Sequence, residues 1–418
     1  MKERSMIEMM EATRLTREER LAEALAILRG SLLDNHRSNV VDDATLPPCA
    51  RTPGVLDMMP PSTETGDAWT ALQSSAAQTA GGRKGMGRLP VPAALRRSFD
   101  RLGQLGAALR LDGQVGPAVG RAPVHVPAGA RFEKRSYANE AGSRTYKLYV
   151  PSAYNGQALP LVVMLHGCTQ SPDDFALGTQ MNELAEEQTF LVCYPAQSQS
   201  ANVSKCWNWF NAGNQQRDQG EPSLVAGITR WIMRDYAVEP GRVFIAGLSA
   251  GGAAAAVMGS TYPDLYAAIG VHSGLACGAA TDIPSAFDAM RQGRSPAVWD
   301  ERAHGGLRRA VPTIVFHGDG DMVVNPINAD QVIAQSKAAA DLRTTISRGT
   351  ARGGMCYTRT VQADASGQPI LEQWVVHGAG HAWSGGSSAG SYTEPRGPDA
   401  SREMMRFFLE RSITASGV

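Results

Sequence analysis

The chain has 418 residues, and its 40 Lys and Arg balance its 40 Asp and Glu, so the formal net charge is zero at pH 7. That balance gives no electrostatic reason to expect nucleic acid as a partner, and no run of 18 or more apolar residues predicts a membrane-spanning helix. The length accommodates one large α/β domain with extra segments, or two domains.

The N-terminal part of the sequence predicts an amphipathic helix followed by a linker. Within residues 1–33, a capping-box pattern at Thr16–Glu19 precedes leucines and alanines at helical spacing. Residues 34–128 are rich in Pro, Gly, Ser, Thr and Ala, so we expect a low-complexity linker that is mostly disordered. Arginines and leucines interleave over 95–110, which indicates either a solvated linker or a segment that contacts a polyester granule or a membrane together with the rest of residues 1–110.

The N-terminus indicates the cellular compartment, and the cysteine spacing indicates whether a metal site is expected. Met1–Arg4 leads into a charged stretch without an apolar core, so the sequence favours the cytoplasm over a secretory route. The six cysteines are scattered, with no Cys-x-x-Cys pair and no histidine at ligand spacing. We therefore expect no metal site and no cofactor.

The pattern changes at about residue 129, and residues 129–412 predict a single catalytic domain. Residues 144–150 alternate apolar and polar side chains, as an antiparallel edge strand does. Short continuous apolar runs then predict parallel strands buried on both faces. These runs are 161–165, 190–194, 243–246, 266–271, 313–316 and 374–376. Helical patterns separate several of them, for example around 224–232, 329–340 and 404–408. The alternation predicts an α/β fold with a mostly parallel central sheet flanked by helices.

The most informative stretch runs from Arg242 to Ala256. It contains Gly247-Leu248-Ser249-Ala250-Gly251 between an apolar strand and an alanine-rich helix, the pattern of a nucleophile elbow. Ser249 is the predicted nucleophile, and the Ala250 N–H at the helix N-terminus is a predicted oxyanion donor. Ser388 lies in a second Gly-x-Ser-x-Gly, but no strand precedes it and no helix pattern follows.

A serine hydroxyl needs a base, and five histidines follow Ser249 in the chain: His272, His304, His317, His377 and His381. In α/β-hydrolases the order is Ser, acid, His, with the last two on loops after later strands. His381 lies in a glycine-rich loop past the last predicted strand, so it is the predicted base. His317 is expected to fix the acid loop, and His377 is expected to be structural.

The acid and the second oxyanion donor are less sharply defined by spacing. Asp319 and Asp321 both follow the predicted strand 313–316, and spacing does not separate them. After the strand 161–165, the N–H of Cys168 or Thr169 can face the site as the second donor.

Four motifs together resemble the poly(3-hydroxybutyrate) depolymerase family of esterases. They are Leu165-His166-Gly167-Cys168-Thr169-Gln170, Cys206-Trp207-Asn208-Trp209-Phe210, Gly247-Leu248-Ser249-Ala250-Gly251-Gly252 and Gly380-His381-Ala382-Trp383. The likeness runs from about 131 to 408. It implies an α/β-hydrolase fold and a serine esterase or depolymerase acting on short-chain polyhydroxyalkanoate or its oligomers.

The resemblance also implies roles for individual residues. The family pattern His-Gly-x-x-Asp falls on Asp321, which makes it the expected acid. Trp207, Trp209 and Trp383 fall at positions that resemble an aromatic substrate surface. Cys168 and Cys206 lie in motifs whose family counterparts can be oxidised, so the resemblance suggests a bridge between them.

Other functions stay open at this point. Feruloyl or acetylxylan esters are alternative substrates on the same fold, and a serine peptidase is a third enzyme class. A protein that binds granules or membranes with weak activity is the alternative outside enzymes. The family resemblance also makes the extracellular region an alternative location to the cytoplasm.

Overall fold

The computed structural model describes residues 58–59, 70–71, 123–293, 311–337 and 342–413. The chain divides into two units, 1–48 and 49–418. The predicted helix in 1–33 and the basic segment 95–110 lie outside the described residues, as does most of the predicted linker. Inside that linker, β1 (Met58–Met59) and β2 (Thr70–Ala71) form a short antiparallel pair.

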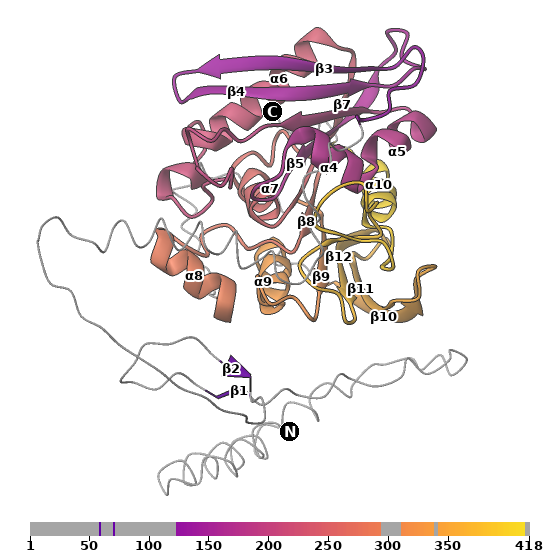
Figure 1. Cartoon of the computed structure of the whole chain (residues 1–418). Helices are drawn as coiled ribbons and strands as arrows, with labels where there is room; N and C mark the ends of the chain where they lie inside the picture. The colour runs from indigo at the N-terminus through magenta and orange to yellow at the C-terminus, as the bar shows by residue number, and fades with distance from the viewer. Residues whose placement is uncertain (1–57, 60–69, 72–122, 294–310, 338–341, 414–418) are drawn as a thin grey trace, which may run out of the picture. The chain divides into compact units, whose positions relative to one another are not determined.

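The second unit is built on a ten-stranded sheet in the order β10-β11-β12-β9-β8-β7-β5-β6-β4-β3 (Figure 1). Its strands are β3 (Arg131–Asn139), β4 (Gly142–Val150), β5 (Leu159–Leu165), β6 (Leu191–Pro195), β7 (Val238–Leu248), β8 (Ala268–His272), β9 (Thr313–Gly318), β10 (Arg343–Thr350), β11 (Cys356–Ala363) and β12 (Pro369–Val376). The six from β6 to β12 in the middle of this order run parallel. The outer pairs at both edges are antiparallel. A separate parallel pair, β13 (Trp383–Ser384) and β14 (Thr393–Glu394), follows the last sheet strand.

Helices cover both faces of the sheet. The described helices are α4 (Pro172–Thr179), α5 (Met181–Gln188), η1 (Ala212–Gln215), α6 (Gly220–Asp235), α7 (Ala250–Thr261), α8 (Ile283–Gln292), α9 (Ile327–Ser336) and α10 (Ala400–Leu409). Apolar residues of α6, α7, α8 and α9 belong to one buried cluster, and those of α4, α5 and α10 to another. The sheet therefore separates two cores, as the predicted mostly parallel sheet between helices requires.

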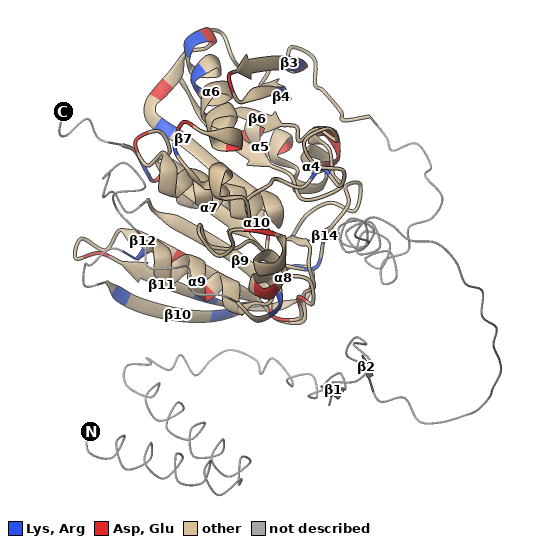
Figure 2. Ribbon diagram, turned by 90° about the vertical axis from the view of Figure 1, so that its left-hand side faces the viewer, with Lys and Arg blue, Asp and Glu red and all other residues tan. Residues whose placement is uncertain are grey.

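The central strands explain why two cores form. All seven residues of β5 are buried; Leu161 and Val163 pack in the first core, and Val162 and Met164 pack in the second. Successive side chains of a strand point to opposite faces, so a continuous apolar run supplies both. No Lys, Arg, Asp or Glu occurs in β5, β6, β8 or β9, and charged residues lie on helices, loops, the other strands and the start of β7 (Figure 2).

The strand predictions need two corrections. Residues 144–150 belong to an antiparallel strand, but β4 is not at the edge, because β3 pairs outside it. At the other edge, β10 and β11 were not predicted, since β10 is exposed along almost its whole length and has no apolar period. The carboxyl ends of β5, β7, β8, β9 and β12 lie at one edge of the parallel part, where loops can converge on a site. None of the helices in the described part of the chain has the length and apolar character needed to cross a bilayer.

Candidate active site

Ser249 lies at the sharp turn between β7 and α7. Its backbone has φ 58° and ψ −120°, a conformation that non-glycine residues rarely adopt, and its N–H donates to the His272 carbonyl at 2.8 Å. A Cβ on Gly251 would lie 2.0 Å from the Leu165 carbonyl oxygen, and one on Gly247 would lie 2.3 Å from Gly251. The glycines are therefore required by close backbone packing, as a nucleophile elbow predicts.

Asp321 and His381 form a buried hydrogen-bonded pair. Asp321 Oδ2 lies 2.7 Å from His381 Nδ1, and the two side chains are 0% and 10% exposed. Asp321 Oδ1 accepts the N–H groups of Val323 and Val324, each at 2.9 Å. These backbone contacts fix the carboxylate, so it can hold the imidazole in one orientation and one tautomer.

Neighbouring histidines keep the Asp321 carboxylate ionised. Burial alone would raise its pKa, but hydrogen bonds and charge interactions with His317 and His381 outweigh burial and hold the pKa well below its usual range. His317 Nε2 lies 3.3 Å from Asp321 Oδ2 and donates to the Val324 carbonyl at 2.8 Å. This contact confirms the prediction that His317 fixes the acid loop.

The other carboxylate of the same loop takes a different partner. Asp319 Oδ2 lies 2.8 Å from His377 Nδ1, and both side chains are about 40% exposed. His377 Nε2 lies 2.8 Å from the Thr358 hydroxyl. Contact therefore separates two acids that spacing left equivalent, because only Asp321 is paired with His381.

Of the remaining described histidines, His166 and His272 are buried and neutral, and His125 is exposed. Burial lowers the pKa of His166 to about 4 and lowers that of His272 well below its ordinary value. His166 Nδ1 lies 2.7 Å from the Gly167 carbonyl, and His272 Nε2 accepts the Ser384 N–H at 2.9 Å. His304 lies outside the described residues.

The loop after β5, residues 166–170, carries the predicted second oxyanion donor, and we call it the oxyanion loop. The Thr169 N–H donates to the Ser204 carbonyl at 2.6 Å, so Thr169 cannot also point this N–H at a substrate. Within the described residues, no hydrogen-bond acceptor is recorded for the N–H of Cys168 or of Ala250. Of the predicted donors, the structure therefore leaves Cys168 and Ala250.

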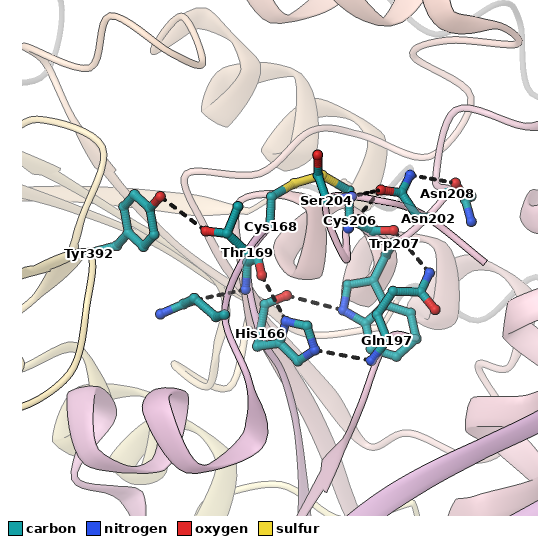
Figure 3. Close-up of a disulfide and its surroundings, with 12 residues drawn as sticks. His166, Cys168, Thr169, Gln197, Asn202, Ser204, Cys206, Trp207, Asn208 and Tyr392 are labelled. Carbon is teal, nitrogen blue, oxygen red and sulfur yellow. Dashed lines mark hydrogen bonds between the residues drawn. A yellow bond between two sulfur atoms is a disulfide. The ribbon is translucent and has the colours of Figure 1, made fainter. Parts of the chain in front are cut away.

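The oxyanion loop is cross-linked to the segment 202–208 (Figure 3). A disulfide joins Cys168 to Cys206, as the resemblance suggested, and the Trp207 indole donates to the His166 carbonyl at 3.1 Å. Glu221 of α6 binds the last residue of this segment, accepting the Asn208 N–H at 2.7 Å and its side-chain amide at 2.8 Å.

The three predicted substrate tryptophans are all buried. Trp207 and Trp383 are 1% exposed and Trp209 is 6% exposed. The Trp383 indole donates to the Ser401 hydroxyl at 3.0 Å. Because all three indoles are buried, they do not form an exposed aromatic surface.

Strained backbone gathers around these loops. Positive φ angles of non-glycine residues occur at Thr169 (66°), Lys205 (53°), Ser249 (58°), Ser273 (47°) and Tyr392 (54°). Such conformations persist where the surrounding structure fixes them, and they concentrate at functional sites.

Sequence reasoning missed Tyr392, whose hydroxyl lies 3.2 Å from that of Thr169 and whose carbonyl accepts the Trp383 N–H at 2.7 Å. It therefore joins the oxyanion loop to the segment that follows His381. A tyrosine in a Gly/Ser-rich loop was the only available signal.

Comparisons with known proteins identify the family and the fold. The family model described as esterase PHB depolymerase matches residues 144–359, just over half of the chain. The matched region contains Ser249 and Asp321 and ends before His381. A solved acetyl xylan esterase from Aspergillus awamori superposes with a TM-score of 0.51 at 20% identity, covering 67% of this chain and 99% of that one. The fold is that of an α/β-hydrolase.

Two curated relatives show how far the sequence similarity extends. Poly(3-hydroxyalkanoate) depolymerase C of Paucimonas lemoignei is 34% identical over 239 residues, which is 56% of this chain and 57% of the relative. Acetylxylan esterase A of Talaromyces purpureogenus is 28% identical over 216 residues, covering 49% of this chain and 55% of the relative. The chain thus spans little more than half the length of these relatives.

Proposed function

Because the chain belongs to the PHB depolymerase family of esterases, we propose that it is a carboxylic ester hydrolase that cleaves short-chain polyhydroxyalkanoate or its oligomers. The proposed catalytic residues are Ser249, His381 and Asp321. The observation that carries the proposal is the buried 2.7 Å contact between His381 and Asp321, on loops that follow strands of the same sheet as the strained serine elbow.

The first chemical step is attack of the Ser249 hydroxyl on the ester carbonyl. His381 Nδ1 is held by Asp321, so Nε2 is the nitrogen left to take the serine proton. The ionised carboxylate then stabilises the imidazolium that forms. His381 returns the proton to the leaving alcohol, and the acyl group stays on the serine.

The oxyanion of each tetrahedral intermediate needs fixed donors. Ala250 N–H lies at the N-terminus of α7, and Cys168 N–H lies on the oxyanion loop beside the elbow, where a Cβ on Gly167 would be 3.6 Å from that of Ser249. One such donor typically lowers the barrier by about 2.7–4 kcal/mol. Water activated by His381 then releases the acid and restores the serine.

The substrate class rests on the relatives and stays open to one alternative. The relative with 34% identity is named as a polyhydroxyalkanoate depolymerase, which favours hydroxyacyl polyester or oligomer. Acetylxylan and feruloyl esterases at 28% identity support polysaccharide esters as the second candidate.

The disulfide bears on the proposed location. Disulfides persist in oxidising compartments and are rare in the cytoplasm, so the Cys168–Cys206 bridge favours the extracellular region over the cytoplasm.

The test is turnover of p-nitrophenyl butyrate, hydroxybutyrate oligomers, ferulate esters and acetylated xylan by wild type and by Ser249→Ala. We expect fastest turnover of the hydroxybutyrate or butyrate esters and loss of nearly all activity in the variant. An unchanged rate in Ser249→Ala would overturn the catalytic assignment. Granule co-sedimentation that survives this variant and is lost on deleting residues 1–110 would support a binding protein, and cleavage of peptides alone would support a peptidase.

A further inference from the structure

The two carboxylates of the loop after β9 have separate partners on the loop after β12. We call residues 377–381 the histidine loop. Asp321 binds its last residue, His381, and Asp319 binds its first, His377. The proposed mechanism uses only the first of these two contacts.

Asp319 makes a dense set of contacts with the start of the histidine loop. Its Oδ1 accepts the Gly378 N–H at 2.6 Å, and its Oδ2 accepts His377 Nδ1–H at 2.8 Å. Its own N–H donates to the Val376 carbonyl at 3.2 Å, at the end of β12. The carboxylate therefore holds the loop at the point where the chain leaves the sheet.

In the rest of this segment, Ala379 is buried in the second core, and a glycine lies on each side of it. Gly378 has φ +78°, and Gly378 and Gly380 have no neighbour within 4 Å of a Cβ position. The Gly320 N–H donates to the Ala379 carbonyl at 3.0 Å, which joins the middle of the loop to the acid loop. Glycine leaves the backbone many conformations, so these hydrogen bonds and the packing of Ala379 together decide where His381 lies.

Thr358, on β11, contacts the second nitrogen of the His377 ring. Its hydroxyl lies 2.8 Å from His377 Nε2, so the imidazole is held on both nitrogens. Hydroxyl, imidazole and carboxylate lie in the order seen in a nucleophile triad, but Thr358 is in the middle of a paired strand, opposite Arg348 on β10 and Val375 on β12. It lacks the elbow and the helix N-terminus that Ser249 has, so this arrangement serves position and not nucleophilic attack.

We propose that Asp319 is a positioning residue for the reaction: acting through His377 and the Gly378 amide, it fixes the histidine loop so that His381 stays aligned between Asp321 and Ser249. This inference rests on the proposed function. A displacement of about 1 Å in a reacting group can reduce the rate about 10²-fold. The loss belongs in kcat, because Asp319 is not proposed to touch the substrate.

The experiment compares Asp319→Ala and Asp319→Asn with wild type in kcat and KM on p-nitrophenyl butyrate. The matched control is Asp364→Asn, since Asp364 also accepts backbone N–H groups, from Ser366 and Gln368, but in the turn between β11 and β12. Thermal unfolding checks that each variant is folded. The downfield proton resonance of the His381–Asp321 hydrogen bond, assigned with His381→Gln, measures alignment without any substrate.

For Asp319→Ala we expect kcat to fall about 10- to 100-fold with KM within about twofold, together with a shifted or broadened His381 resonance. Asp319→Asn keeps an oxygen for Gly378 and should recover part of kcat, and Asp364→Asn should match wild type. Wild-type kcat in a folded Asp319→Ala, or a loss confined to KM, would overturn the inference alone. A wild-type protein without ester turnover would overturn the proposed function, and an unchanged resonance in Asp319→Ala would then overturn the positioning role independently.

Discussion

In the proposed mechanism the oxyanion loop and the histidine loop serve the same serine, but the two loops are held in different ways. The oxyanion loop is joined to its neighbour by the Cys168–Cys206 disulfide and by the Thr169 N–H bond to Ser204. Within the described residues, the histidine loop has no covalent cross-link, and hydrogen bonds to Asp319 and Asp321 hold it.

The difference fits the role proposed for each loop. An oxyanion donor must stay still while charge develops, so a covalent lock suits it. A general base gains and loses a proton in every cycle, and a neighbouring carboxylate stabilises its charged form. We therefore expect the oxyanion loop to be sensitive to loss of the disulfide and the histidine loop to be sensitive to loss of its carboxylates.

The largest expected effect is on the histidine loop. His381→Ala removes the proposed base, and kcat should fall about 10⁴-fold or more, by analogy with removal of a triad member. The measurement is kcat on p-nitrophenyl butyrate, with the exposed His125→Ala as control. A loss below tenfold would show that the imidazole of His381 is not the base.

The next prediction concerns the disulfide that holds the oxyanion loop. Replacing both Cys168 and Cys206 with Ala leaves every backbone N–H in place but frees the loop, so kcat should fall about 10²-fold as one donor loses its alignment. The bridge spans a sequence separation of 38 residues, and its loss should lower the free energy of unfolding by about 3–4 kcal/mol.

Denaturant titration and kcat measure the two effects of this variant separately. Cys277→Ala is the control, because Cys277 is buried and not bonded to another cysteine. Full activity in the double variant would mean that the hydrogen bonds of Thr169 and Trp207 suffice to hold the loop, and the contrast between the two loops would disappear.

A smaller effect concerns the pH dependence of stability, and it comes from a histidine in the oxyanion loop. His166, in the locked oxyanion loop, is neutral in the folded protein because burial lowers its pKa to about 4, whereas an unfolded histidine has a pKa of about 6.5. The unfolded state then binds more protons between these values. The contribution of neutral His166 to the free energy of unfolding is therefore complete above about pH 6.5. It falls by up to about 3 kcal/mol as the pH drops to about 4.

The check is urea unfolding of wild type and His166→Asn at several values between pH 4 and 7. The slope of unfolding free energy against pH should be shallower in the variant, while buried His272 keeps part of the dependence in both. Equal slopes would contradict the assignment. Asp321 acts at lower pH: its pKa is depressed, so its contribution is present above about pH 4 and is lost on further acidification.

The sequence predicted the elbow and the parallel sheet, and it singled out His381 as the proposed base, because each has a local pattern. It could not separate Asp319 from Asp321, since the choice depends on which histidine each one meets across the loops. It could not separate the N–H groups of Cys168 and Thr169 either, because the Ser204 carbonyl that occupies one of them belongs to a distant segment.

The burial of individual side chains was the second feature that the sequence could not predict. The resemblance placed Trp383 on a substrate surface, but the structure packs its ring against His272 at 5.0 Å and Phe175 at 5.4 Å between ring centroids. An indole gives the same sequence signal in a core and at a surface, and only tertiary contacts decide. The strand β10 was missed for the opposite reason, since its exposure leaves no apolar period to detect.

The smallest expected effect is Ser388→Ala, outside both loops, which should change kcat less than about twofold because exposed side chains without a special contact are tolerant of substitution. Ser388 has the same Gly-x-Ser-x-Gly pattern as Ser249, but its glycines have another cause. A Cβ on Gly386 would lie 2.5 Å from the Gly178 carbonyl oxygen, and one on Gly390 would lie 2.4 Å from Gly178 Cα, so both allow this turn to pack on α4. The measurement is kcat of Ser388→Ala compared with wild type and with Ser249→Ala. A large loss in Ser388→Ala would mean that this turn positions the site as well.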